Sequence, residues 1–115
     1  MKKFIKLIYE KNKNVKNDSN EENCFDKKLE NFVNSSFRNL LGYGLKWQME
    51  LLILKDGNMY SNAYHPNYKT HYDWKKRIIK GIKEDDYITF TYHRGYDPKN
   101  IIKWIKNDYM KMLGN

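Results

Sequence analysis

The sequence has little cysteine, arginine or alanine: its 115 residues include one cysteine, three arginines and one alanine. Because a single cysteine cannot form an internal disulfide, we expect the reducing environment of the cytoplasm. No run reaches the roughly 18 apolar residues that a membrane-spanning helix needs. Near the N-terminus, Lys6 and Glu10 interrupt the apolar stretch, so we expect no secretory signal peptide.

The shortage of arginine also qualifies the basic charge of the chain. Lysine and arginine number 22 against 14 acidic residues, a formal net charge of +8, yet 19 of the 22 are lysines. Arginine binds phosphate with a planar fork that lysine lacks, so selection for phosphate binding alone would favour it. Abundant Lys, Asn, Ile and Tyr are typical of AT-rich genes. We therefore expect a low-GC bacterium, or one of its phages or plasmids, as the source.

The charge is concentrated in two basic blocks. Residues 1–16 and residues 69–83 each carry a net charge of +5. Only the second block lies within a segment that has a regular hydrophobic pattern. Residues 10–23 carry almost no apolar side chains and are predicted to form a mobile polar loop. The remaining composition, 40% hydrophobic and 16% aromatic, predicts one folded domain over residues 1–115.

Hydrophobic periodicity predicts an α+β domain with a mostly antiparallel sheet of about four strands and three helices. Apolar residues at helical spacing predict helices over 25–41, 73–83 and 98–113. Alternating or β-branched segments predict strands over 4–9, 45–53, 58–64 and 87–94. The element order is therefore β-α-β-β-α-β-α.

Several boundaries follow from turn and capping residues. Gly42 is expected to end the first helix in a left-handed conformation, and Asp56-Gly57 to form a two-residue hairpin turn. Asp73 and Asp97 are expected to cap the second and third helices. The second helix would turn an apolar side inward and a basic side outward. The predicted inward residues are Trp74, Ile78, Ile79 and Ile82, and the outward ones are Lys75, Lys76, Lys80 and Lys83.

The segment from Tyr60 to Arg77 alternates aromatic rings with cations, a combination typical of single-stranded nucleic-acid binding, in which bases stack on rings and cations follow the phosphates. The alternative is that its tyrosines only cover sheet edges. The predicted binding residues are Tyr64, His65, Tyr68, Lys69, Tyr72, Trp74, Lys75, Lys76 and Arg77. We expect a non-enzymatic protein that binds a single strand, RNA or a nucleoprotein complex. In a phage or mobile element it would regulate or inhibit a host nuclease complex.

A second hypothesis is a metal-independent ribonuclease of the toxin kind. His65, His71 and His93 would supply the general acid and base, and Lys69 or Arg94 would stabilise the charged transition state. Against it, His65 and His93 lie at strand ends, where histidines often have no catalytic role. The spacing of His65 and His71 is not that of a zinc site, so no metal or cofactor is expected.

A third hypothesis is an inhibitor or immunity protein that binds one protein partner. Trp104 falls outside the buried stripe of the last helix, and exposed tryptophans often anchor protein interfaces. The predicted hairpin over 43–64 is the other candidate surface. Because the chain is basic, such a partner would have an acidic surface.

Overall fold

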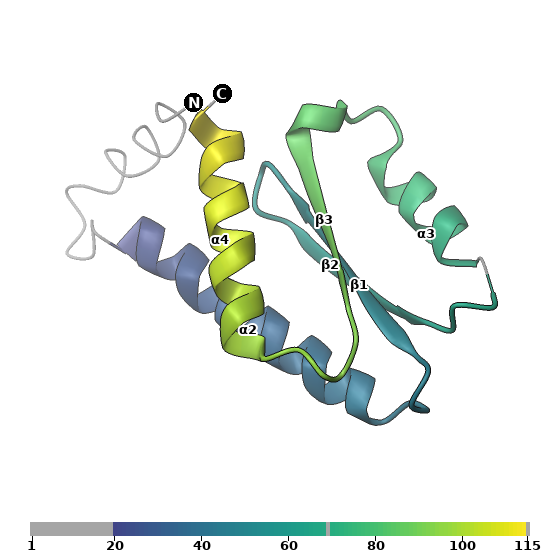
Figure 1. Ribbon diagram of the computed structural model, residues 1–115. Coiled ribbons are helices and arrows are strands. Elements are labelled where there is room, and N and C mark those ends of the chain that lie inside the picture. Colours follow the sequence, from purple (N-terminus) through teal and green to yellow (C-terminus); the bar gives the residue numbers. More distant parts are fainter. Residues whose placement is uncertain (1–19, 69, 115) are drawn as a thin grey trace.

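The computed structural model describes residues 20–68 and 70–114 (Figure 1). The predicted strand over 4–9 and the first ten residues of the predicted loop, 10–19, lie outside this part. The elements are the helices α2 (Asn20–Leu41), α3 (Thr70–Ile79) and α4 (Pro98–Gly114), the short 3-10 helix η1 (Glu84–Asp86), and the strands β1 (Gln48–Leu54), β2 (Met59–Tyr64) and β3 (Tyr87–Tyr92).

The strands form one antiparallel sheet in the order β2-β1-β3. The predicted α+β class, with three α-helices and an antiparallel sheet, is confirmed for the described residues. The predicted number of about four strands is not, since the sheet there has three. The remaining predicted strand is the one that lies outside the described residues.

Helices α2 and α4 pack on one face of the sheet, and α3 lies on the other (Figure 1). The main hydrophobic core lies on the α2 and α4 side, where Met49, Leu51 and Ile53 of β1 are completely or almost completely buried. Phe25 of α2 stacks on Tyr109 of α4, with ring centroids 4.1 Å apart. The domain is thus a three-layer arrangement with a thick layer on one side and the single short α3 on the other.

Strand β1 is buried on both faces, because it lies between the other two strands and helices cover both sides. Glu50, Leu52 and Leu54, which point toward α3, are therefore buried as well. The sequence predicted a half-buried strand that begins at Leu45. The predicted start is wrong, since Leu45 precedes the strand and is 79% exposed. The predicted half-burial is wrong as well, since both faces of the strand are buried.

The alternation predicted for the two outer strands is confirmed. Tyr60, Asn62 and Tyr64 pair with the β1 residues that face α3. On β3, Ile88, Phe90 and Tyr92 pair with the β1 residues that face the main core. The threonines between them, Thr89 and Thr91, are exposed, so α3 leaves this part of the sheet uncovered.

Helix α2 begins earlier and ends differently than predicted. It starts at Asn20, so residues 20–23 belong to the helix and not to the predicted loop 10–23. It ends at Leu41, but Gly42 does not have the predicted left-handed conformation. Instead, the amides of Gly42 and Tyr43 bond to carbonyls three residues back, which tightens the last turn into 3-10 geometry.

Helix α3 starts at Thr70, so Asp73 lies within its first turn and is not the predicted N-cap. There its carboxylate still interacts favourably with the positive end of the helix. The helix ends at Ile79, before the predicted end near residue 83. Gly81 has φ +80°, the left-handed conformation that ends helices, and the amide of Ile82 bonds back to Ile79.

The hairpin between β1 and β2 has a three-residue turn, not the predicted two-residue turn. The Leu54 amide donates to Asn58 O at 2.8 Å, which leaves Lys55, Asp56 and Gly57 in the loop. A two-residue type I′ turn needs positive φ at both central residues, and only Gly57 has it, at +96°.

The predicted N-cap of the last helix is confirmed, since Asp97 Oδ1 accepts the amide of Lys99 at 3.0 Å. Among the helices of residues 20–68 and 70–114, none combines the length and the apolar character that a bilayer crossing requires.

Candidate nucleic-acid interface

A tight turn over residues 65–68 follows β2 and directs Tyr68 into solvent. The amide of Tyr68 donates to His65 O at 2.9 Å, and the amide of Asn67 donates to the His65 ring at Nδ1. Pro66 lies inside this turn, where its fixed φ suits the backbone. The turn leaves Tyr68 64% exposed, two residues before α3 begins.

The outer side of α3, with the first residue after the helix, combines one tyrosine with three cations. Tyr72 and Lys76 are four residues apart on the helix, which places them on one face with about 6 Å between them, and Lys80 follows directly after the helix ends at Ile79. Arg77 lies beside Lys76, and all four side chains are exposed. The carboxylate of Asp73 also lies on the outer side. None of the three cations forms an ion pair with another described residue.

Tyr64 of the predicted binding set and His71 of the ribonuclease hypothesis are used in packing instead. His71 is 8% exposed, and its ring stacks on Tyr64 at a centroid distance of 3.8 Å and contacts Tyr72 at 4.1 Å. The Tyr64 hydroxyl donates to Gln48 Oε1 at 2.8 Å. Burial raises the pKa of Tyr64 above its usual value, against a hydrogen bond with Thr91 that lowers it. Tyr64 and His71 therefore hold α3 to the sheet.

Lys75 was predicted to point outward, and this is wrong. Its Nζ atom lies 3.6 Å from Oε2 of Glu50, and its side chain is only 28% exposed. Lys75 follows His71 by four residues, and residues at this spacing lie on the same face of a helix. Lys75 therefore lies on the inward face, as His71 does. A buried carboxylate on the central strand also requires a nearby cation. The ammonium of Lys75 is thus used within the fold.

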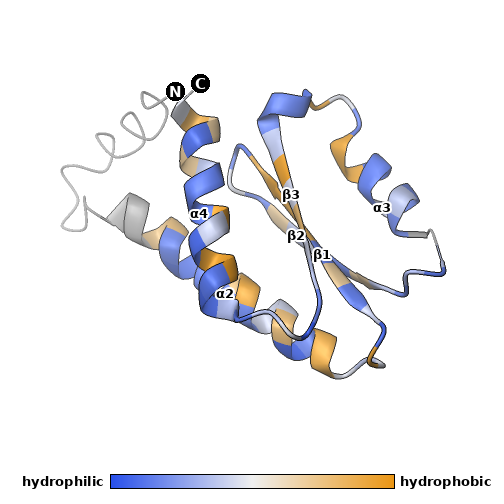
Figure 2. Cartoon of the chain, viewed as in Figure 1, coloured by the Kyte–Doolittle hydropathy of each residue, from blue (hydrophilic) through white to orange (hydrophobic). Residues whose placement is uncertain are grey.

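The apolar side of α3 covers the sheet only partly. Trp74, Ile78 and Ile79 of the helix, and Ile82 after it, were predicted to face inward; each is only partly buried, and none joins the main core. The hydrophobic residues of α3 lie toward its C-terminal end, and the rest of the helix is hydrophilic or neutral (Figure 2). Lys69 of the predicted set lies outside the described residues.

Sequence reasoning missed two rings, Tyr43 and Trp47, in the loop between α2 and β1. They stack at 4.6 Å, Trp47 meets His65 edge-on at 5.9 Å, and His65 meets Tyr68 at 5.4 Å. We call these four residues, Tyr43, Trp47, His65 and Tyr68, the ring row. The signal in the sequence was Tyr43 between two glycines.

Arg94 holds the loop that carries Tyr43. Its Nη2 atom donates to the carbonyl oxygens of Tyr43, at 2.6 Å, and Gly44, at 3.3 Å. The guanidinium thus joins the end of β3 to the start of the ring row. It has a positioning role that the sequence did not predict.

The three histidines lie in different settings. His71 is buried between two tyrosine rings. His65 and His93 each accept a backbone amide at Nδ1, from Asn67 and Gly95. In the neutral ring the proton then lies on Nε2, which leaves no ring nitrogen free to act as a base. This arrangement of His65 and His93 does not favour the predicted ribonuclease chemistry, and His71, whose Nδ1 has no hydrogen-bond partner among the described residues, is only 8% exposed.

Trp104 lies on the opposite side of the sheet and is 44% exposed. Its ring stacks on Phe90 of β3 at 5.8 Å and meets Tyr96 edge-on at 6.2 Å. One side of the ring is therefore used in packing, and only the remainder is open to a partner. Within the described part of the chain, no group of three or more His, Cys, Asp or Glu side chains could hold a metal ion.

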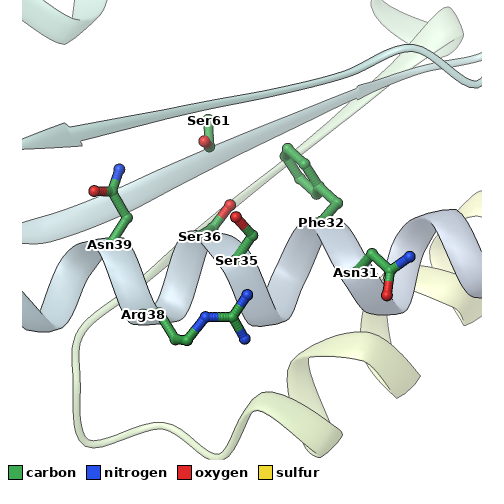
Figure 3. A pocket seen from close by; sticks show the side chains of 7 residues that line it. All are labelled: Asn31, Phe32, Ser35, Ser36, Arg38, Asn39 and Ser61. Carbon is green, nitrogen blue, oxygen red and sulfur yellow. The ribbon is translucent and has the colours of Figure 1, made fainter.

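A polar hollow lies between α2 and β2 (Figure 3). Ser36 of α2 points toward Ser61 of β2, and Phe32 and Asn39 point in the same direction. Arg38 points away from the strands. Ser36 is 4% exposed, so it contributes to the packing between helix and strand. Serine and asparagine side chains dominate the hollow, and no titratable group points into it among those in the figure.

Neither a protein-family model, a curated protein nor a solved structure matches this chain.

Proposed function

We propose that the protein binds a nucleic-acid strand, free or within a nucleoprotein complex, through the outer side of α3 and without catalysing a reaction on it. The observation that supports this most is the group of exposed residues Tyr72, Lys76 and Arg77 on α3, with the exposed Lys80 directly after the helix. Cations on one face follow a phosphate backbone, and their binding releases counterions from the nucleic acid. Tyr72 adds an exposed aromatic ring to this group of cations.

Two residues of the predicted nucleic-acid-binding set are not part of the proposed site. The ammonium of Lys75 pairs with the carboxylate of Glu50, and the ring of Tyr64 stacks on His71. Tyr68, Tyr72, Lys76 and Arg77 keep their proposed role, and Lys80 joins them. A protein of this kind in a phage or plasmid would act by occupying the nucleic-acid channel of a host nuclease complex. It would need affinity for the strand and no active site.

The test is the binding of a labelled 20-nucleotide single strand, followed by fluorescence anisotropy. We expect the triple variant Lys76→Gln, Lys80→Gln and Arg77→Gln to bind at least about tenfold more weakly than the wild type, since three phosphate contacts are lost. The matched control changes Lys99, Lys103 and Lys111, which are exposed on α4, to glutamine. It removes the same net charge from the opposite side of the sheet.

The α4 control variant distinguishes a binding site on α3 from electrostatic attraction to the protein as a whole. Equal weakening in both triple variants would mean that total charge governs binding and that α3 carries no site. The absence of binding by the wild type would refute the proposed function directly. Circular dichroism of each variant establishes that the fold is retained.

A further inference from the structure

We propose that the ring row stacks on unpaired bases, so that the protein binds single strands in preference to duplexes. The inference rests on the proposed function, because it assumes that α3 binds the phosphates of the same strand. The ring row and the outer side of α3 share no residue. Tyr68 connects them, since it ends the ring row two residues before α3 starts.

The ring row is a chain of ring contacts between residues that flank two strands. Successive ring centroids lie 4.6, 5.9 and 5.4 Å apart from Tyr43 to Tyr68. The two end rings are open, with Tyr43 40% and Tyr68 64% exposed, and the two middle rings are partly exposed. The rings are inclined to one another by 27°, 86° and 59°, so the row offers separate rings and not one flat platform. An exposed ring accepts a nucleobase of any sequence, because every base has a π-face.

The row is also held in place before any ligand arrives. Arg94 fixes the backbone at Tyr43 and Gly44, and the amide of Trp47 donates to Gly44 O at 3.1 Å. The turn at His65 fixes Tyr68 in the same way. A strand that binds to fixed rings avoids the entropic cost of ordering the loops, which strengthens binding.

The charge around the row selects an anionic partner. Leu41 and Leu45, two residues before and after Tyr43 in the chain, are 48% and 79% exposed, and by themselves they would also suit a protein. However, Lys46 is exposed within the same loop, and Lys76 and Arg77 are exposed on the helix that follows Tyr68. A ligand that is both flat and apolar on one side and anionic on the other is a nucleotide strand.

The preference for single strands follows from the same geometry. In a duplex the faces of the bases are covered by their neighbours, so a ring can stack on a base only when that base is unpaired. A duplex would contact the α3 cations alone. The ring row therefore supplies the energy that distinguishes the two forms.

The experiment compares three ligands of one length: oligo-dT, an abasic strand with the same sugar-phosphate backbone, and a duplex. We expect the wild type to bind oligo-dT at least about fivefold more tightly than the other two, since one stacked base contributes about 1 kcal/mol or more. The double variant Tyr43→Leu and Tyr68→Leu keeps apolar bulk but loses both open rings. It should bind oligo-dT no better than the abasic strand, with unchanged affinity for the latter.

The control is Tyr60→Leu, which changes a tyrosine at the far end of β2 that is 37% exposed. It should keep the preference for oligo-dT. Equal affinity of the wild type for oligo-dT and the abasic strand would overturn this inference and leave the role of α3 intact. A failure to bind any of the three would overturn both. Displacement of oligo-dT by polyglutamate at equal charge concentration would also overturn it, and would indicate an acidic protein partner.

Discussion

The Nζ atom of Lys75 on α3 lies 3.6 Å from Oε2 of Glu50 on the central strand. Glu50 is only 5% exposed, and its other oxygen, Oε1, has no hydrogen-bond partner among the described residues. The apolar side chains of α3 are partly exposed, so hydrophobic burial holds this helix less firmly than it holds α2 and α4. The attachment of α3, and with it the candidate interface, therefore depends on a polar contact.

Replacing Lys75 with methionine should lower the free energy of unfolding by about 2 kcal/mol. Removing one partner of a fully buried ion pair costs about 3–5 kcal/mol, and the partial exposure of Lys75 reduces this. Replacing both residues, Glu50→Leu with Lys75→Met, should restore stability to within about 1 kcal/mol of the wild type. Urea denaturation of the wild type, the single variants Lys75→Met and Glu50→Leu, and the double variant measures these changes. Additive losses in the double variant would show that the two side chains do not interact.

Lys75 and Lys76 are adjacent in sequence but should differ in function. Lys76 is exposed, so Lys76→Gln should weaken single-strand binding. Lys75 pairs with Glu50, so Lys75→Gln should lower the free energy of unfolding instead. In the α3 triple variant, the slope of log affinity against log salt should become shallower by about 2, roughly 0.7 for each lost phosphate contact. A titration from 50 to 200 mM salt, about the usual range for this effect, measures the slope. An unchanged slope would place the phosphate contacts elsewhere.

Arg94→Lys should loosen the loop that carries Tyr43 while keeping the charge. Both bonds come from the Nη2 atom of Arg94, and the lysine side chain is one bond shorter, so its ammonium does not reach the position of Nη2. We expect a loss of about 1 kcal/mol in stability. Amide hydrogen exchange at Trp47 should be faster, because its bond to Gly44 O depends on the loop. Unchanged exchange at Trp47 would mean that the loop is held by its own packing.

Local patterns predicted the parts of this fold that depend on neighbouring residues. The alternation in β2 and β3 and the cap at Asp97 are set within a few positions of the chain, and the structure confirms them. The burial of β1 on both faces was also visible, in the apolar run Leu51 to Leu54, but alternation from Leu45 to Glu50 suggested a half-buried strand. Its position between two strands is a property of the sheet and not of the segment.

The ring row shows why the site was harder to predict. Trp47 contacts His65 because the hairpin register places Gln48 opposite Tyr64. The two-residue turn predicted at Asp56-Gly57 would shift that register by one residue and place Trp47 opposite Pro66. One additional residue in a turn thus decides which rings meet. The inward direction of Lys75 is equally non-local, since its partner Glu50 lies 25 residues earlier in the chain.

Tyr109 provides a test of the core at alkaline pH. Its ring is 5% exposed, and its hydroxyl donates to Lys55 O at 2.8 Å, which ties α4 to the hairpin turn. Burial, and secondarily the Asp56 carboxylate, raises the pKa of Tyr109 from 10.0 to about 12. Between these values the unfolded chain has released this proton and the folded chain has not. The stability that the neutral hydroxyl contributes is therefore complete below pH 10 and decreases as the pH rises toward 12.

Tyr109→Phe removes both the hydrogen bond and the titration. Near neutral pH the variant should be about 1 kcal/mol less stable than the wild type, because the Lys55 carbonyl loses its donor. By about pH 11 the wild type should have lost about 1.4 kcal/mol through Tyr109, whereas the phenylalanine variant loses nothing at this position. The difference between the two proteins should then disappear or change sign. Urea denaturation of both, under identical buffers, cancels the titration of the lysines. A stability difference between the two proteins that stays constant over this pH range would show that Tyr109 has the same pKa in the folded and the unfolded chain.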